Sequence, residues 1–141
     1  MAEPEVTFAK LDFDRGERFQ TLRQELDVGS FGINLLLMQP RQRGRVHRHE
    51  RQEEVYVVLE GQLTLVVEGA EHVLGAREAV RVPAELRRQL VNAGPERLVL
   101  LALGGDGEHA GRDGLAWESW DEDGPGRPPQ EVSPPTDLPA S

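Results

Sequence analysis

Short apolar runs separated by glycine or proline dominate the middle of this 141-residue chain. Residues 31–38 (FGINLLLM) form the most apolar run, and Gln39-Pro40 closes it. Further strand-like runs recur at short spacing, at residues 45–49, 54–59, 62–67, 71–74, 79–82, 88–92 and 97–103. Regular short strands with such punctuation are typical of an antiparallel sandwich or barrel. No segment has a helical hydrophobic period of useful length, so the sequence predicts an all-β fold.

The segments before and after the apolar runs are expected to be accessory to a barrel at residues 31–104. Residues 1–30 are predicted to form an arm with two edge strands, at residues 5–10 and 21–26.

After the barrel, residues 105–123 contain both tryptophans, Trp117 and Trp120, and are expected to pack back onto the barrel wall. Residues 124–141 hold six of the ten prolines and almost nothing apolar. This composition predicts a disordered or loosely draped acidic tail.

Two histidines and a carboxylate lie close together in the chain, at His47, His49 and Glu54. Residues two apart on a strand point to the same face, so both imidazoles are expected to project together. Glu54 opens the next run, where it shares one face with Tyr56 and Val58. If these strands are neighbours in a small barrel, the three groups converge inside it. Divalent iron, manganese and zinc accept such a ligand set.

The stretch from Gly44 to Gly61 resembles the first motif of the cupin superfamily, G-x5-H-x-H-x(3,4)-E-x6-G. Only two residues separate Gly44 from His47, whereas Glu54 lies at the motif distance before Gly61. Glu53 fits the shorter motif spacing from His49 but would face the opposite side of the strand from Tyr56 and Val58, so Glu54 is preferred.

The second cupin motif, G-x5-P-x-G-x2-H-x3-N, is matched in part further along the chain. Pro83 and Asn92 stand at their motif positions, both motif glycines are replaced, and Arg88 occupies the position of the third metal-binding histidine. The resemblance covers roughly residues 31–104 and implies a small double-stranded β-helix, the jelly-roll or cupin barrel. This fold hosts many unrelated functions.

The resemblance implies one divalent ion (Fe, Mn, Zn or Ni) held by His47, His49 and Glu54. Arg88 cannot ligate a cation, and at roughly 4 Å it would repel one by several kcal/mol. Two arrangements avoid that cost: Arg88 forms a bidentate pair with Glu54 in place of the metal, or it turns aside and waits for an anionic ligand. Tyr56 is the second ligand-binding candidate, with a barrel-lining aromatic as its alternative role.

Other polar residues receive structural or solvent roles. Asn92 begins a turn, and His72 and His109 have no partner at ligand spacing. Arg87 and Gln89 are expected to face solvent. The arginines around the histidines form either a solvated rim or a surface that steers an anionic molecule to the barrel mouth; they are Arg41, Arg43, Arg45, Arg48 and Arg51.

Composition excludes several classes of function. The net charge of −9, concentrated after Gly104, disfavours a nucleic-acid partner. The chain has no cysteine, which excludes thiolate sites and fits the cytoplasm. Without a signal segment or a membrane-length apolar run, a soluble cytoplasmic protein with no membrane partner is expected. Lys10 is the only lysine and there is no phosphate loop, so neither a nucleotide nor a flavin cofactor is expected.

Three functions fit these observations, and they leave open whether the protein is an enzyme. The first is a small-molecule-binding protein, with a ligand that is anionic if Arg88 contacts it, and with a degenerate metal site. The second is a non-haem metal-dependent oxygenase or isomerase acting on a small organic acid. The third is an interaction module that uses the tryptophan segment or a dimer face. A homodimer, paired through the early strands, is expected.

Overall fold

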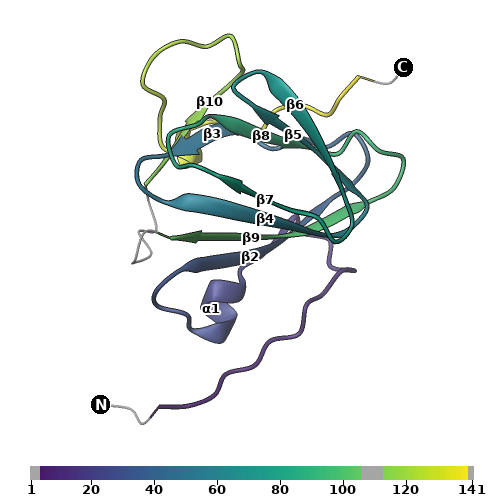
Figure 1. Ribbon diagram of the computed structural model, residues 1–141, viewed down its shortest axis with the longest axis vertical. Helices are drawn as coiled ribbons and strands as arrows, with labels where there is room; N and C mark the ends of the chain where they lie inside the picture. Colours follow the sequence, from purple (N-terminus) through teal and green to yellow (C-terminus); the bar gives the residue numbers. More distant parts are fainter. Residues whose placement is uncertain (1–3, 106–112, 140–141) are drawn as a thin grey trace.

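Two antiparallel five-stranded sheets face each other in the computed structural model, which describes residues 4–105 and 113–139 (Figure 1). The first sheet has the order β1-β2-β9-β4-β7 and the second β10-β3-β8-β5-β6. The strands are β1 (Phe19–Gln20), β2 (Gly32–Met38), β3 (Val46–His49), β4 (Glu53–Glu60), β5 (Gln62–Val67), β6 (Ala70–Gly75), β7 (Ala79–Val82), β8 (Arg88–Val91), β9 (Leu98–Gly105) and β10 (Gly114–Trp117). This arrangement confirms the predicted all-β jelly roll.

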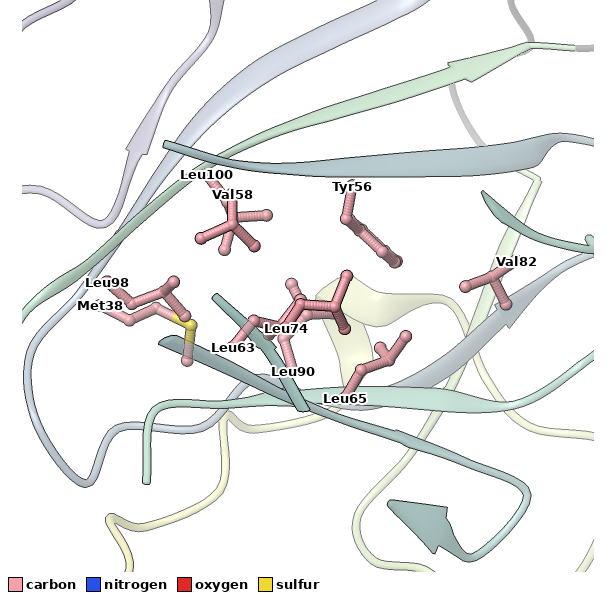
Figure 2. Packing of buried hydrophobic residues seen from close by; sticks show 10 residues of the cluster. All are labelled: Met38, Tyr56, Val58, Leu63, Leu65, Leu74, Val82, Leu90, Leu98 and Leu100. Atoms are coloured by element: carbon pink, nitrogen blue, oxygen red, sulfur yellow. The ribbon is translucent and has the colours of Figure 1, made fainter. Parts of the chain in front are cut away.

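Strand alternation divides the apolar side chains between two cores. The inward side chains fill the space between the sheets (Figure 2), and they are Met38, Tyr56, Val58, Leu63, Leu65, Leu74, Val82, Leu90, Leu98 and Leu100. On the outer face of the first sheet, Leu35, Leu37 and Val99 form a smaller cluster with Leu22. Because β4 directs Tyr56 and Val58 inward, Glu54 on the same face also points between the sheets, as predicted.

A short helix, α1 (Leu22–Leu26), replaces the edge strand expected at residues 21–26. Leu22 and Leu26 lie four residues apart, so one helical face carries both against the outer face of the first sheet. The residues between them, Arg-Gln-Glu, are all good helix formers. The edge strand expected at residues 5–10 is also wrong, because that segment has no strand pairing.

Two strands of the structure lie outside the predicted runs. β1 pairs with β2, and β10 pairs with β3, where Gly114 stands opposite His49 and Ala116 opposite His47. Trp117 is buried and its indole nitrogen donates to the carbonyl of Gly124, so part of the tryptophan segment does lie against the barrel. β10, which carries Trp117, therefore pairs with the edge of β3 that faces away from β8.

The C-terminal segment is anchored to the barrel instead of being disordered, so that expectation is corrected for residues 124–139. Ala116 and Arg127 exchange backbone hydrogen bonds, and a 3-10 helix, η1 (Pro129–Glu131), follows. Val132 is 1% exposed, and its carbonyl oxygen accepts a hydrogen bond from the guanidinium of Arg45. A few polar anchors and one buried side chain hold a segment whose composition alone predicts disorder.

Among the described residues, no helix is long and apolar enough to pass through a bilayer. His109 lies outside the described residues, so its predicted surface role stays untested.

Candidate metal and ligand site

One carboxylate oxygen lies at the centre of the candidate site. Glu54 Oε1 is 3.4 Å from His47 Nε2, 3.1 Å from His49 Nε2 and 2.6 Å from the hydroxyl of Tyr56, which donates to it. The histidines come from β3 and the other two residues from β4, which belong to opposite sheets. The structure therefore brings together the three residues predicted as metal ligands and places Tyr56 beside them.

Each imidazole turns its Nδ1 to a hydrogen-bond acceptor. His47 Nδ1 lies 3.1 Å from the carbonyl oxygen of Arg45, and His49 Nδ1 lies 2.8 Å from Asp113 Oδ1. Since a carbonyl or a carboxylate oxygen can only accept, both Nδ1 atoms carry protons, and in the neutral rings both Nε2 atoms present lone pairs. His49 Nε2 is buried and is not aligned for a hydrogen bond to Glu54 despite their separation. Two lone pairs facing one carboxylate require a cation between them, either protons or a metal ion.

Arg88 lies under this group and is 0% exposed. Its Nη2 donates to the carbonyl oxygen of Pro83 at 2.7 Å, and its Nη1 lies 3.7 Å from Glu54 Oε1. Within the described residues, Arg88 Nε and Nη1 are buried without hydrogen-bond partners. The contact with Glu54 is thus a single long ion pair and not the bidentate pair that one of the predicted arrangements requires.

Asp113, just before β10, is a site residue that sequence reasoning missed. Its carboxylate accepts hydrogen bonds from His49 Nδ1, from the backbone N–H groups of Arg51 and Gln52, and from the side-chain amide of Gln52. Asp113 belongs to neither motif and is 64 residues from His49 in the chain. Nothing in the local sequence distinguishes it from the other acidic residues that follow the barrel.

The ionisable groups of the site perturb one another strongly. Burial alone would lower the pKa of His49, but its contacts with Glu54 and Asp113 outweigh burial and raise that pKa above 6.5. Burial would raise the pKa of Glu54, yet both histidines hold it well below its usual range. Burial and the neighbouring Glu54 charge raise the pKa of Tyr56 well above 10, so its hydroxyl stays protonated. The site therefore combines an ionised carboxylate with a neutral phenol donor.

Two adjoining cavities open beside these groups, with volumes of about 450 and 360 Å³. His49, Glu54, Asn34 and Ala102 line both of them, and Tyr56 and His47 line the smaller one. Asn34 Oδ1 is a buried acceptor with no hydrogen-bond partner in the part of the chain that the structure describes. Together the cavities have room for a small organic molecule next to the histidines and the carboxylate.

The C-terminal segment forms one side of the cavities. Pro129 lines both of them, and a side chain at Gly114 would meet its ring. Arg43 and Arg45, expected at the rim, donate to the carbonyl oxygens of Thr136 and Val132, so they hold this segment in place. Arg43 and Arg45 therefore bind the segment that borders the cavities and do not form a solvated rim.

The strand of Arg88 is also more enclosed than expected. Gln89 is buried; its side-chain oxygen accepts from the indole of Trp120 and its amide donates to the carbonyl of Gly44. Arg87 lies 5.5 Å from the ring centre of Trp117 and 5.6 Å from that of Trp120. The prediction that Arg87 and Gln89 face solvent is wrong for Gln89 and holds only in part for Arg87, whose side chain is 31% exposed beside the tryptophan segment.

Asn92 has the structural role that its turn position predicts. Its side-chain amide donates to the carbonyl oxygens of Met38 and Glu96, and its side-chain oxygen accepts from Gly94 N. The residue ties two strand ends together away from the histidines.

The two separations between Glu54 and the histidines fit a shared divalent ion. Metal bonds of about 2.0–2.2 Å at tetrahedral or octahedral angles place neighbouring ligand atoms roughly 3.0–3.4 Å apart. The 3.1 and 3.4 Å distances from Glu54 Oε1 to the two Nε2 atoms lie in this range. The unpartnered His49 Nε2 is the kind of buried atom that a metal would satisfy. The charge of Arg88 opposes an ion here.

The fold and this inward-facing His-His-Glu group define a cupin-type β-barrel. Residues 34–104 match the family described as "Cupin domain", and the chain belongs to that family.

Comparisons with individual proteins agree with this family. "Polyketide synthase CurC" of Streptomyces cyaneus is 31% identical over 84 residues, which cover 58% of this chain and 54% of that protein. A cupin protein from Bacteroides fragilis superimposes with a TM-score of 0.67 at 16% identity, covering 74% of this chain and 86% of that one. A Cupin 2 conserved barrel domain protein from Salinispora arenicola has a TM-score of 0.58 at 26% identity, covering 75% and 89%. The chain matches only about half the length of the Streptomyces relative.

Proposed function

We propose that this protein is a small-molecule-binding cupin that holds one divalent ion through His47, His49 and Glu54. The observation that supports this most directly is the convergence of two Nε2 lone pairs on one ionised carboxylate oxygen. Two histidines and one carboxylate leave coordination positions open for a ligand, as in other facial triads. When bound, the ion would supply a Lewis acid beside the cavities.

Arg88 makes this site weaker for a metal alone and better for a metal with an anion. A guanidinium 3.7 Å from Glu54 Oε1 repels a cation bound to that oxygen. Arg88 lines neither cavity, but its Nε and Nη1 atoms have no hydrogen-bond partner among the described residues, and an anionic ligand would satisfy these charged donors after a small shift of the side chains between them and the cavity. We therefore propose an anionic small molecule as ligand, with Tyr56 as a neutral donor next to it.

The printed name of the Streptomyces relative connects that protein to polyketide synthesis. Polyketides carry 1,3-dicarbonyl groups whose enolate oxygens bind divalent ions and accept from guanidinium and phenol donors. A 1,3-diketone such as acetylacetone is therefore a suitable ligand probe beside simple carboxylates.

Elemental analysis of protein purified without an affinity tag tests the metal directly. We expect sub-stoichiometric iron, manganese, zinc or nickel, and a Mn(II) affinity that rises at least threefold when acetate is added. This coupling follows because an anion near Arg88 removes part of the repulsion on the metal. Glu54→Ala is expected to abolish both metal retention and coupling. A protein that binds no divalent ion at millimolar concentration, with or without acetate, would contradict the proposal.

A metal-dependent oxygenase or isomerase acting on a small organic acid is the alternative. It is favoured by the protonated Tyr56 hydroxyl, which donates to Glu54 Oε1 at 2.6 Å and is released to donate to substrate if a metal ion takes that carboxylate oxygen. The test is oxygen uptake or substrate isomerisation with the metal-loaded protein. Activity that survives Glu54→Ala would exclude a mechanism through this site.

A homodimer is also proposed, because the N-terminal arm presents Val6 and Phe8 at 81% and 85% exposure. Such exposed apolar side chains favour burial against a second copy. Light scattering of the intact chain is expected to give twice the monomer mass, and Phe8→Ser to shift the equilibrium toward monomer. A monomeric wild-type protein at micromolar concentration would rule this out.

A further inference from the structure

We infer that Asp113 is a positioning residue that fixes the ring orientation and the tautomer of His49. This inference depends on the proposed metal site for its consequence, but its geometry stands by itself. Asp113 Oδ1 accepts a hydrogen bond from His49 Nδ1 at 2.8 Å. With Nδ1 held there, the imidazole ring points its Nε2 toward Glu54.

The carboxylate of Asp113 is itself held from several directions. Oδ2 accepts from Arg51 N at 3.1 Å and from Gln52 N at 2.9 Å, while Oδ1 accepts from Gln52 Nε2 at 2.7 Å as well as from His49. The residue is 9% exposed. Three of these four donors belong to Arg51 and Gln52, so they hold the carboxylate in place independently of His49. The imidazole therefore takes the orientation that this fixed carboxylate allows.

The chemistry of the site requires a carboxylate here. All four groups that face Asp113 are N–H donors, and only an ionised carboxylate offers acceptors on both atoms. An asparagine would turn its amide N–H₂ either to the two backbone donors or to His49. The second orientation keeps the side-chain oxygen on the two backbone donors, so it is favoured, and His49 Nδ1 would then become the acceptor while the ring proton moves to Nε2, the atom needed for a metal.

The two histidines differ in how they are oriented. His47 uses the carbonyl of Arg45, two residues away on its own side of the barrel, whereas His49 depends on a side chain just before β10. Gly114 pairs with His49 in the β10–β3 ladder, so the docking of β10 and the aim of His49 are linked. This makes the second imidazole dependent on a segment outside the barrel motifs.

The first test uses the wild-type protein without metal. Nitrogen-15 spectra of the histidine rings, taken at a pH where His49 is neutral, are expected to show Nδ1 protonated and Nε2 unprotonated for both His47 and His49. A proton on Nε2 of His49 would overturn the inference, and this result does not depend on the folding of any variant.

The second test compares Asp113→Asn with Val99→Ala, a core substitution in the cluster on the outer face of the first sheet. We expect Asp113→Asn to weaken Co(II) binding by about 10–100-fold, the usual effect of removing a partner behind a metal-binding histidine, and to move the His49 proton to Nε2. Val99→Ala, although destabilised, is expected to bind Co(II) within threefold of wild type and to keep the His49 tautomer. A folded Asp113→Asn protein with unchanged tautomer and affinity would refute the positioning role. If wild type itself binds no Co(II) while the tautomer is as expected, the metal proposal fails and the positioning of His49 stands.

Discussion

Replacement of Arg88 by methionine is expected to tighten divalent-metal binding by at least tenfold. A metal ion bound to Glu54 Oε1 lies about 2.1 Å from that oxygen, and Arg88 Nη1 lies 3.7 Å from it, so an ion–guanidinium distance of about 5 Å is reasonable. For charges of +2 and +1 and an effective dielectric near 20, the repulsion is about 7 kcal/mol. A tenfold gain needs only about 1.4 kcal/mol, less than a quarter of this value.

A second effect of the same substitution acts in the same direction. Arg88 neutralises part of the Glu54 charge, and its loss leaves a more strongly anionic ligand for the metal. Methionine keeps most of the buried volume but leaves the carbonyl of Pro83 without its donor, at a cost to stability of about 1–3 kcal/mol. The variant is therefore expected to fold with a somewhat lower urea midpoint.

Isothermal titration of the chelator-treated protein with Mn(II) measures the change. Arg81→Met is the matched control, because Arg81 forms an exposed ion pair with Glu53, whose side chain lies outside the site, and its loss changes the same formal charge. We expect Arg81→Met to alter the affinity less than twofold, and Arg88→His to bind more tightly than Arg88→Met because it adds a fourth ligand. If Arg88→Met binds Mn(II) no better than wild type, the electrostatic account of this site is wrong.

Three further results are expected. Gly61 has φ +83°, and an added Cβ would overlap the carbonyl oxygen of Arg97, so Gly61→Ala should lower the free energy of unfolding by about 3 kcal/mol. Gly69 has a similar φ of +85° but open space around it, so Gly69→Ala should lower the free energy of unfolding by only about 1–2 kcal/mol. Equal losses for the two variants in urea denaturation would contradict the steric argument. Val132→Ala should cost about 2 kcal/mol and speed tryptic cleavage of the C-terminal segment, whereas unchanged cleavage would mean that this side chain is not the anchor. The raised pKa of His49 means that its stabilising contribution is complete below pH 6.5 and is lost as the pH rises through the folded-state value. The melting temperature of metal-free protein should therefore fall from about pH 6 to pH 9, and His49→Gln should flatten that slope; a wild-type curve as flat as the variant's would argue against this coupling.

The barrel and the three candidate ligands could be predicted from the sequence because both depend on local patterns. Strand alternation fixes which residues share a face, so Glu54 and Tyr56 point inward with Val58. The motif distance to Gly61 selects Glu54 rather than Glu53. Strand bounds were accurate where Gly or Pro marks a turn, and β5 and β7 coincide with the predicted runs. These features need only short-range information.

The features that sequence reasoning missed depend on contacts between distant segments. α1 forms because Leu22 and Leu26 find an apolar sheet face to cover, and a five-residue helix is too short to show a period. Asp113 is one acidic residue among several, and only the pairing of β10 with β3 selects it. The C-terminal segment reads as disordered by composition, yet Arg43 and Arg45 hold its backbone, a contact that no local rule signals.

The region that defines family membership, residues 34–104, is not the whole of the site. It contributes the donors around Glu54, but Asp113 aims one of them and Pro129 shapes both cavities from beyond its boundary. Two cupins can therefore agree throughout the matched barrel and still admit different molecules. Transfer of a ligand or a reaction from a relative to this chain is justified only when the alignment extends through the counterpart of η1.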